Sequence, residues 1–233
     1  MKVMTYNVHS CKDARKKDRI DQISALIRKE RPVIVGLNEV ETFSPRTRFV
    51  NQPRRIAAAR DMVYRFGPTL RLGPIGFFGN AILSRFPVCK EKNLRLPGGF
   101  EPRCCLRAVL RVPGGYITVF STHLGLKRRQ RTEQIEELRR LVEKETNPVI
   151  LMGDFNCGPD QLNPLYDFLT DAGSLFGSQL TFPSDRPVDR IDYIMVSHGI
   201  QCQGLSIPAI DASDHLPVIA ELEMPERYDQ TAR

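Results

Sequence analysis

Six short polar motifs in this 233-residue chain supply groups that could perform acid–base chemistry around a metal ion. They contain carboxylates, carboxamides and imidazoles, and each lies at the edge of an apolar run that is typical of a β-strand. Such groups suit a hard divalent cation bound through oxygen, and no cysteine or serine nucleophile is needed among them. The motifs are Thr5-Tyr6-Asn7, Leu37-Asn38-Glu39-Val40, Ser121-Thr122-His123-Leu124, Gly153-Asp154-Phe155-Asn156, Arg190-Ile191-Asp192-Tyr193 and Ser213-Asp214-His215.

Each motif taken alone also has an ordinary structural explanation. A single asparagine such as Asn7 at a strand end usually forms a turn, and Glu39 could simply be a solvated strand end. Asp192 lies inside an apolar segment, so its carboxylate must be paired or hydrogen-bonded, and a histidine is a natural partner. Coincidence does not account for six such motifs at strand edges, and together they predict one active site.

Apolar runs rich in β-branched residues recur along the chain and predict more strands than helices. Two of these runs are separated by Pro113-Gly114-Gly115, which predicts a hairpin turn. The predicted strands cover residues 3–8, 33–37, 80–84, 106–112, 116–120, 149–152, 191–196 and 218–220.

Helical spacing of apolar residues is clearest between Ile20 and Ile27, with Asp18 as the expected N-cap and Arg31-Pro32 as the end. A second helix is predicted from Arg131 to Glu145, where an apolar stripe repeats with helical spacing. Hairpins mixed with crossover helices predict an α+β fold in which sheet packs on sheet and the helices lie outside. Weaker helical patterns cover residues 54–66 and 162–172, and loops are expected over 51–55 and 72–78.

The composition is that of an ordinary globular protein, with 41% hydrophobic and 26% charged residues. We expect one domain over residues 1–225 and a frayed polar tail over 226–233. No apolar run reaches the length of a membrane span, which predicts no integral membrane association. A strand-like run begins at Val3 and leaves no room for a signal peptide, so a cytoplasmic protein is expected. The six cysteines lack zinc-site spacing and are expected to be reduced and mainly buried.

The chain is basic, with a net charge of +7, and its arginines and lysines concentrate over residues 46–71 and 127–131. A basic surface favours an anionic substrate such as DNA or RNA. The alternative is a charged face that serves only solubility.

The order and spacing of the six motifs resemble those of the endonuclease/exonuclease/phosphatase superfamily, over residues 3 to about 223. That superfamily includes pancreatic-type deoxyribonucleases, exonuclease III-like AP endonucleases, bacterial sphingomyelinases and inositol polyphosphate 5-phosphatases, and the chain looks like a small bacterial-type member. The resemblance implies a four-layer α/β/β/α sandwich of two mixed sheets flanked by helices. It also implies hydrolysis of a phosphoester with a divalent metal, usually Mg²⁺, with Mn²⁺ as an alternative.

The resemblance also implies a role for each motif. Glu39 would be the principal metal ligand, helped by Asn7 and Asp214, and Asn7 would also contact the substrate. Asp154 would orient or deprotonate the attacking water. Asn156 would position that water or a phosphate oxygen. His215 would contact the scissile phosphate, and Asp192 would hold the imidazole of His215.

His123 would lie on the leaving-group side, where AP endonucleases instead carry a tyrosine, so the chain is more similar to the deoxyribonuclease and sphingomyelinase branches. Asn80 could contact phosphate or form a structural turn. Arg103 could bind a substrate phosphate or lie at the surface. His9 could point into the site from the strand face of Asn7, or it could be a simple loop residue.

These features predict a Mg²⁺-dependent phosphodiesterase that acts on nucleic acid as an endonuclease or exonuclease, in the form of a monomer. A phospholipase C-like or sphingomyelinase-like enzyme, or a phosphodiesterase or phosphatase of small molecules, is the alternative. The chain has no tryptophan and no evident platform for stacking bases, which favours that alternative. A non-catalytic binding module on the same fold is a third hypothesis.

Overall fold

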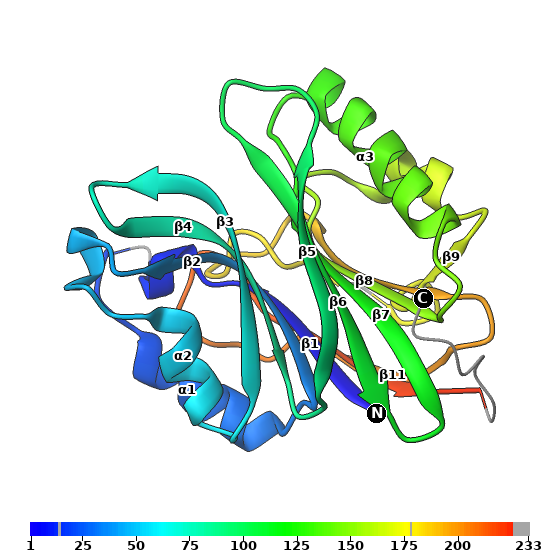
Figure 1. The fold of residues 1–233 in the computed structure, drawn as a ribbon, viewed down its shortest axis with the longest axis horizontal. Helices are drawn as coiled ribbons and strands as arrows, with labels where there is room; N and C mark the ends of the chain where they lie inside the picture. The colour runs from blue at the N-terminus through cyan, green and yellow to red at the C-terminus, as the bar shows by residue number, and fades with distance from the viewer. Residues whose placement is uncertain (14, 178, 226–233) are drawn as a thin grey trace.

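Two six-stranded sheets pack face to face in the computed structural model, which describes residues 1–13, 15–177 and 179–225 (Figure 1). The first sheet has the order β11-β12-β1-β2-β4-β3, and the second has the order β5-β6-β7-β8-β10-β9. Both sheets are mixed, because β1 and β2 pair in parallel, as do β7 and β8, while the other neighbours are antiparallel. The predicted α+β sandwich of two mixed sheets is therefore confirmed.

The strands of each sheet come from separate parts of the chain. The first sheet comprises β1 (Lys2–Asn7), β2 (Ile34–Thr42), β3 (Val63–Leu72), β4 (Gly76–Ser84), β11 (Gln201–Ser206) and β12 (Val218–Glu223). The second comprises β5 (Val88–Leu96), β6 (Arg103–Val112), β7 (Gly115–His123), β8 (Val149–Asp154), β9 (Leu169–Asp171) and β10 (Asp192–Ser197).

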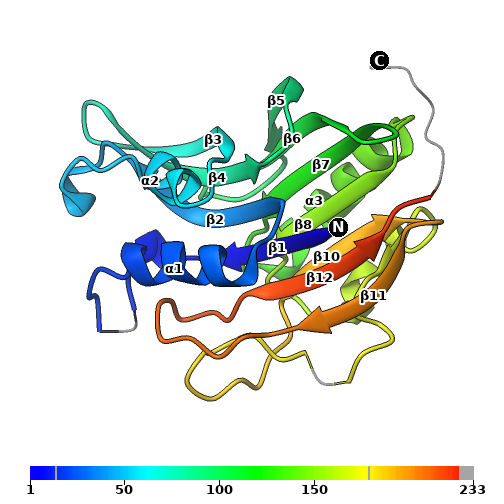
Figure 2. The same ribbon diagram turned by 90° about the horizontal axis from the view of Figure 1, so that it is seen from below.

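Helices cover the outer face of each sheet, as Figures 1 and 2 show. The helices α1 (Ile20–Glu30) and α2 (Gln52–Ala58) lie against the first sheet, where Ile23 packs with Met4 and Leu37. The helix α3 (Arg128–Glu143) covers the second sheet and packs Leu138 against Leu151. Three short 3₁₀ helices complete the described elements: η1 (His9–Cys11), η2 (Pro45–Thr47) and η3 (Pro159–Leu165).

The main core lies between the two sheets, where Ile34 and Ile82 of the first meet Val119 and Ile150 of the second. All four side chains are fully buried. Burial of each such side chain stabilises the fold by about 1.5–3 kcal/mol relative to exposure. Packing on both faces explains why these strands read as continuous apolar runs in the sequence.

Some predicted elements are wrong. The helix predicted over residues 54–66 ends at Ala58, and β3 begins at Val63. Asn51 caps α2 through its side chain, which accepts a hydrogen bond from the Arg54 backbone N–H, so the loop predicted over 51–55 belongs mostly to a helix. The helix predicted over 162–172 is replaced by η3 and β9. The sequence also gave no signal for β3, β5, β9 and β11.

Smaller differences concern the ends of elements. The cap residue of α1 is Arg19, although the Asp18 carboxylate does accept a hydrogen bond from the Ile20 N–H at 3.0 Å. The helix α3 runs from Arg128 to Glu143 and so begins three residues before the predicted start. The hairpin at Pro113-Gly114-Gly115 is confirmed between β6 and β7.

Three further expectations concern the C-terminal tail, membrane-spanning helices and the cysteines. The tail predicted over residues 226–233 lies outside the described residues. None of the described helices is both long enough and apolar enough to cross a membrane. All six cysteines are free, and four of them are buried, whereas Cys89 is exposed and Cys202 is half-buried.

The polar motifs meet because strand register brings their ends to one edge of the sandwich. Asn7 of β1 is the register partner of Asn38 of β2. In the second sheet Asp154 of β8 is the partner of both His123 of β7 and Asp192 of β10. Hydrophobic pairing along the strands therefore fixes the positions of the polar residues that follow them.

Gly153 precedes Asp154 in β8 and has a backbone conformation that glycine favours, with φ of +147°. A Cβ atom there would lie 1.9 Å from the Thr122 carbonyl oxygen. We expect Gly153→Ala to lower the free energy of unfolding by about 1–3 kcal/mol, because both the φ angle and the space exclude a side chain. Gly158→Ala is the matched control, since nothing lies within 4 Å of its Cβ position. Equal urea midpoints for the two variants would contradict this account.

Candidate active site

Asp154 lies at the centre of the polar edge and is almost fully buried. Its Oδ2 accepts a hydrogen bond from the Asn7 amide at 2.9 Å, and its Oδ1 accepts one from the Asn156 backbone N–H at 2.9 Å. The Nε2 atoms of His123 and His215 lie 3.4 and 3.6 Å from Oδ2. One carboxylate is thus held by an amide and a backbone N–H while it faces two imidazoles.

Glu39 reaches the site through an irregularity in β2. The pairing of β2 with β4 shifts register between Leu37 and Val40, and Glu39 adopts φ of +57°. A bulge of this kind turns a side chain away from the regular alternation of a strand. The Asn7 amide donates to Glu39 Oε1 at 3.1 Å as well as to Asp154, so one carboxamide links the two carboxylates.

Asp192 and His215 form a buried pair beside Asp154. Asp192 Oδ2 lies 2.8 Å from His215 Nδ1 and accepts a 2.6 Å hydrogen bond from the Thr181 hydroxyl. The Phe182 ring stands 4.9 Å from the imidazole, centroid to centroid. These contacts hold the imidazole so that its Nε2 atom faces Asp154.

The pKa values in the site are shifted in opposite directions. Burial and the charge of Asp192 raise the pKa of Asp154 to about 7, against the lowering effect of His215. Burial opposes a charged imidazole, but Asp192 outweighs it and raises the pKa of His215 to about 10. Burial, with the positive charges of Arg103 and His215, holds the pKa of His123 well below its usual range. The site therefore combines a charged His215, a neutral His123 and a carboxylate that can exchange a proton near neutral pH.

Asp214 is less enclosed than the other acidic groups. Its Oδ1 lies 3.4 Å from His9 Nδ1 and accepts a 3.2 Å hydrogen bond from the Ser213 hydroxyl, which also donates to the Asn7 carbonyl at 2.8 Å. Its side chain is 33% exposed, and that of Glu39 is 23% exposed. The two carboxylates expected to bind metal are thus open to solvent, unlike Asp192.

The donor set fits a divalent cation. Four carboxylates converge on this edge, and desolvation and charge repulsion already raise the pKa of Asp154, so a cation would relieve the repulsion. The ligand atoms of Asp154, Asp192 and His215 approach within 4.8 Å of one another, but Asp192 and His215 are bonded together and enclosed. Glu39 and Asp214 are the better ligands because Mg²⁺ retains several waters and needs an open position. Asn7 would have to turn its amide, since it now directs Nδ2 toward both carboxylates.

The other two expected substrate contacts, Asn80 and Arg103, are both buried but differ in their hydrogen bonds. The Asn80 amide is buried and bonded on both sides, accepting from Asn38 at 2.9 Å and donating to the Cys104 carbonyl at 3.0 Å. Arg103 pairs with Glu101 at 3.1 Å, is only 6% exposed, and has an Nε atom with no hydrogen-bond partner among the described residues. Of these two, Arg103 has the unpaired donor, and because its Nε atom is itself buried, the guanidinium would have to shift before a phosphate oxygen accepts from it.

Two residues of the site, Asn38 and Thr181, could not be given a role from the sequence. Asn38 was noticed only as the neighbour of Glu39, yet its amide bonds to the backbone of the second sheet. Thr181 lies in an irregular segment far from any motif, and no local pattern marks it as the partner of Asp192.

The two packed mixed sheets of this chain carry an edge rich in carboxylates and imidazoles. The sequence model of the Endonuclease/Exonuclease/phosphatase family matches residues 4–215, and the chain belongs to this family. The resemblance predicted from the six motifs is thereby confirmed. Members of the family hydrolyse phosphoester bonds.

Similar proteins come from several organisms. YbhP of Escherichia coli (strain K12), itself uncharacterized, is 30% identical over 164 residues, which cover 65% of each chain and thus just under two thirds of YbhP. An endonuclease/exonuclease/phosphatase from Beutenbergia cavernae DSM 12333 superposes with a TM-score of 0.77 at 24% identity, over 97% of this chain and 72% of that one. The mannosyl-6-phosphatase Bt3783 of Bacteroides thetaiotaomicron has a TM-score of 0.79 at 20% identity, over 96% and 100%. These structural likenesses concern the fold.

We expect Asp192→Asn to lower the pKa of His215 from about 10, because the largest charge that opposes burial is removed and only Asp154 and Asp214 still raise that pKa. An NMR titration of the imidazole in metal-free protein measures this. Since the folded pKa is the raised one, the pair stabilises the fold fully below 6.5 and loses that effect as pH rises through about 10. Asp160→Asn, at an exposed site in η3, is the control. An unchanged His215 titration in Asp192→Asn would refute the pairing.

Proposed function

We propose that this chain is a divalent-metal-dependent hydrolase that cleaves phosphodiesters. The observation that supports it most strongly is Asp154, a buried carboxylate with a pKa near 7 that faces two imidazoles beside the half-open Glu39. A group that titrates near the working pH is suited to accept a proton from water. Mg²⁺ is the proposed cation and Mn²⁺ the alternative, because the donors are mainly oxygens.

When bound by Glu39 with Asp214 and Asn7, the cation would supply charge stabilisation to the phosphoryl oxygens. Asp154 would take the proton of the attacking water. His215, kept charged by Asp192, would donate a hydrogen bond to a phosphoryl oxygen as negative charge develops there. These assignments use each residue in the protonation state that its surroundings favour.

The remaining groups would position substrate and water. Asn156 has φ of +52° and donates through its amide to the Leu124 carbonyl at 2.9 Å, so it is held rigidly beside Asp154. We assign it to the water or a phosphate oxygen. His123 is neutral and could offer a proton or a hydrogen bond on the leaving-group side. Arg103, with its unpaired Nε, is proposed to hold a substrate phosphate.

Nucleic acid is the proposed substrate class on the strength of the basic charge, with a small phosphodiester as the alternative. The arginines over residues 46–71 support the alternative more, because several already have partners. Arg55 pairs with Asp21, Arg65 with Glu91 and Arg46 with the buried Glu41. A continuous track for a long polyanion would leave such guanidinium groups facing solvent together.

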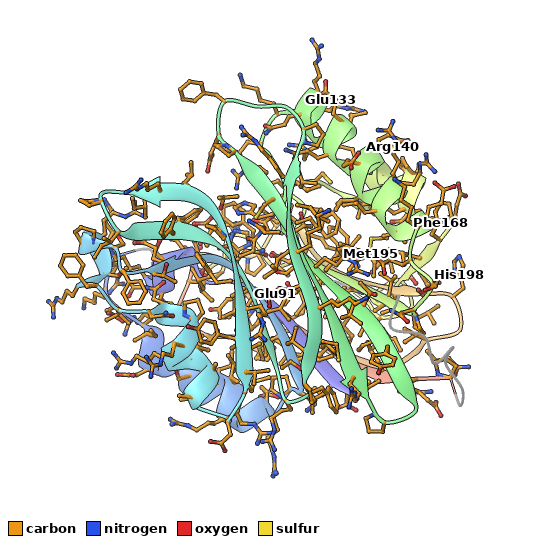
Figure 3. The ribbon with its side chains drawn as sticks, in the orientation of Figure 1. Glu91, Glu133, Arg140, Phe168, Met195 and His198 are labelled. Carbon is orange, nitrogen blue, oxygen red and sulfur yellow. The ribbon has the colours of Figure 1, made fainter. Side chains whose placement is uncertain are left out.

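Metal dependence is tested with bis(p-nitrophenyl) phosphate. We expect a chelator to abolish hydrolysis and Mg²⁺ or Mn²⁺ to restore it. Glu39→Gln should raise the metal concentration needed for half-maximal activity by at least about tenfold, because it removes a ligand charge. Glu133→Gln on α3 (Figure 3) is the control and should behave as wild type, since that carboxylate is exposed and distant. Full activity in excess chelator would exclude the metal mechanism.

The acid–base assignment predicts losses in kcat. Asp154→Asn and His215→Ala should each lower kcat at least about a hundredfold, the usual scale for such groups. The double variant Asp192→Asn/His215→Ala should be little worse than His215→Ala alone, because Asp192 acts through that imidazole. Steady-state kinetics at saturating substrate measure both effects. Losses that simply multiply would show that Asp192 has an independent role.

A further inference from the structure

A cavity of about 460 Å³ opens beside the catalytic edge and shares His9 and Glu39 with it, and the rest of its lining is different. Its basic residues come from the segment after η1 and from η2, and its apolar residues come from the hairpin of β3 and β4. The basic residues are Lys12, Lys16 and Arg46, and the apolar residues are Leu70, Leu72 and Phe78.

The two lysines bring positive charge that the protein itself does not neutralise. Among the described residues, no carboxylate lies within ion-pairing distance of the Lys12 or Lys16 ammonium group. Lys12 Nζ donates only to the Arg46 carbonyl, at 3.4 Å. The carboxylates of Glu39 and Glu101 also line the cavity, but Glu101 pairs with Arg103 and Glu39 accepts a hydrogen bond from Asn7. Neither is paired with the two lysines, and an anion in the cavity would offset the repulsion between the ammonium groups.

The Arg46 side chain is held at the same cavity by an ion pair with the Glu41 carboxylate. Glu41 is fully buried in β2. Burial raises the pKa of Glu41, but hydrogen bonds from Arg46, Ser10 and Ser44 outweigh it and hold that pKa below its usual range. The guanidinium therefore has a fixed position and keeps free N–H groups, a geometry that suits phosphate oxygens.

The apolar side is a continuous stripe on one face of the hairpin. Leu70 is the register partner of Phe78, and Leu72 lies two residues further along the same strand. Residues two apart in a strand share a face, so the three half-buried side chains lie together. A hydrocarbon segment or a flat ring could cover this stripe.

We propose that this cavity binds a second phosphate of the substrate, which is joined to the scissile phosphoester by a short apolar linker. The linker lies over Leu70, Leu72 and Phe78, and the second phosphate meets Lys12, Lys16 and Arg46. This inference rests on the proposed function, because it assigns the scissile phosphate to the edge at Glu39. It makes the two-phosphate pattern, rather than overall charge, the basis of substrate choice.

Two synthetic substrates isolate the effect of the second phosphate. Both are p-nitrophenyl phosphodiesters of 1,4-butanediol, and the far end of the butyl chain carries either a hydroxyl or a phosphate. We expect the phosphate-terminated compound to have a KM at least about tenfold lower, which is the scale of one charge-assisted contact. Equal KM values at low salt would overturn the inference.

Charge-removing variants tie the preference to the cavity. Lys12→Gln/Lys16→Gln should abolish the preference for the phosphate-terminated compound and leave kinetics on the hydroxyl-terminated compound unchanged. Arg46 is kept, because its loss would strand the buried carboxylate of Glu41. Arg54→Gln removes an exposed charge of α2 outside the cavity and should retain the full preference. A preference that survives in the double variant, or that is lost in the control, would refute the assignment.

Binding distinguishes failure of this inference from failure of the proposed function. Calorimetry should show that 1,4-butanediol bisphosphate binds more tightly than 1,4-butanediol monophosphate. This difference in affinity should disappear in Lys12→Gln/Lys16→Gln. Such binding without any turnover of either diester would support the cavity and overturn the phosphodiesterase proposal. Turnover of both diesters without that difference in affinity would overturn the cavity alone.

Oligothymidylates of increasing length test whether neighbouring phosphates of nucleic acid are the source of the pattern. Affinity that rises at the second phosphate through Lys12 and Lys16 and then levels off supports the cavity. Affinity that keeps rising with length and does not depend on these lysines indicates an extended electrostatic track, which overturns the proposal.

Discussion

The Asn38 carboxamide is the interaction on which the rest of the site depends. It is fully buried, and its Nδ2 donates to the Thr122 carbonyl and to Asn80, both at 2.9 Å, while its Oδ1 accepts the Asp154 N–H at 3.0 Å. These bonds join β2 of the first sheet to β7 and β8 of the second at the edge where the polar motifs end. Loss of this amide would leave buried backbone groups unpaired, at a cost of about 1–3 kcal/mol each. Because Asn38 is committed to the opposite sheet, the next residue, Glu39, departs from regular strand geometry and turns toward the site.

Strand pairing within the second sheet creates much of the electrostatics of the site. Asp154 and Asp192 are register partners, so regular pairing of β8 and β10 brings two buried carboxylates together. Their repulsion is tolerated because His215 and Asn7 bond to them, and it raises the pKa of Asp154 toward neutrality. The hydrophobic sheets thus bury Asp154, and this burial together with the charge of Asp192 makes it a useful proton acceptor.

The central part of the fold could be predicted because its strands are buried on both faces and read as continuous apolar runs. The edge strands could not. The exposed β5 carries Lys90, Glu91 and Lys92, charges that protect a sheet edge and remove the apolar signal. Six motifs indicated the site residues because four of them end a strong apolar run and the other two, at Asp192 and His215, stand at the start of a strand or just before one. The bonding of Asn38 could not be predicted, because it depends on a contact between segments far apart in the chain, and Thr181 could not be predicted, because it lies in an irregular segment without a repeating pattern.

One strand connects catalysis with the proposed recognition of a second phosphate. β2 carries Asn38, which joins the sheets, then Glu39 at the catalytic edge, and then Glu41, which holds Arg46 at the cavity. The segment after β1 is coupled to the same edge, since the His9 N–H donates to the Asn7 carboxamide at 3.1 Å and Lys12 follows on the cavity side. The backbone of β2 and of the segment after β1 therefore sets the spacing between the attachment points of the groups in the two regions. Under the proposed recognition, a substrate would gain from both regions only when its own two phosphates match that spacing, so geometry, more than net charge, would determine which phosphoesters the site accepts.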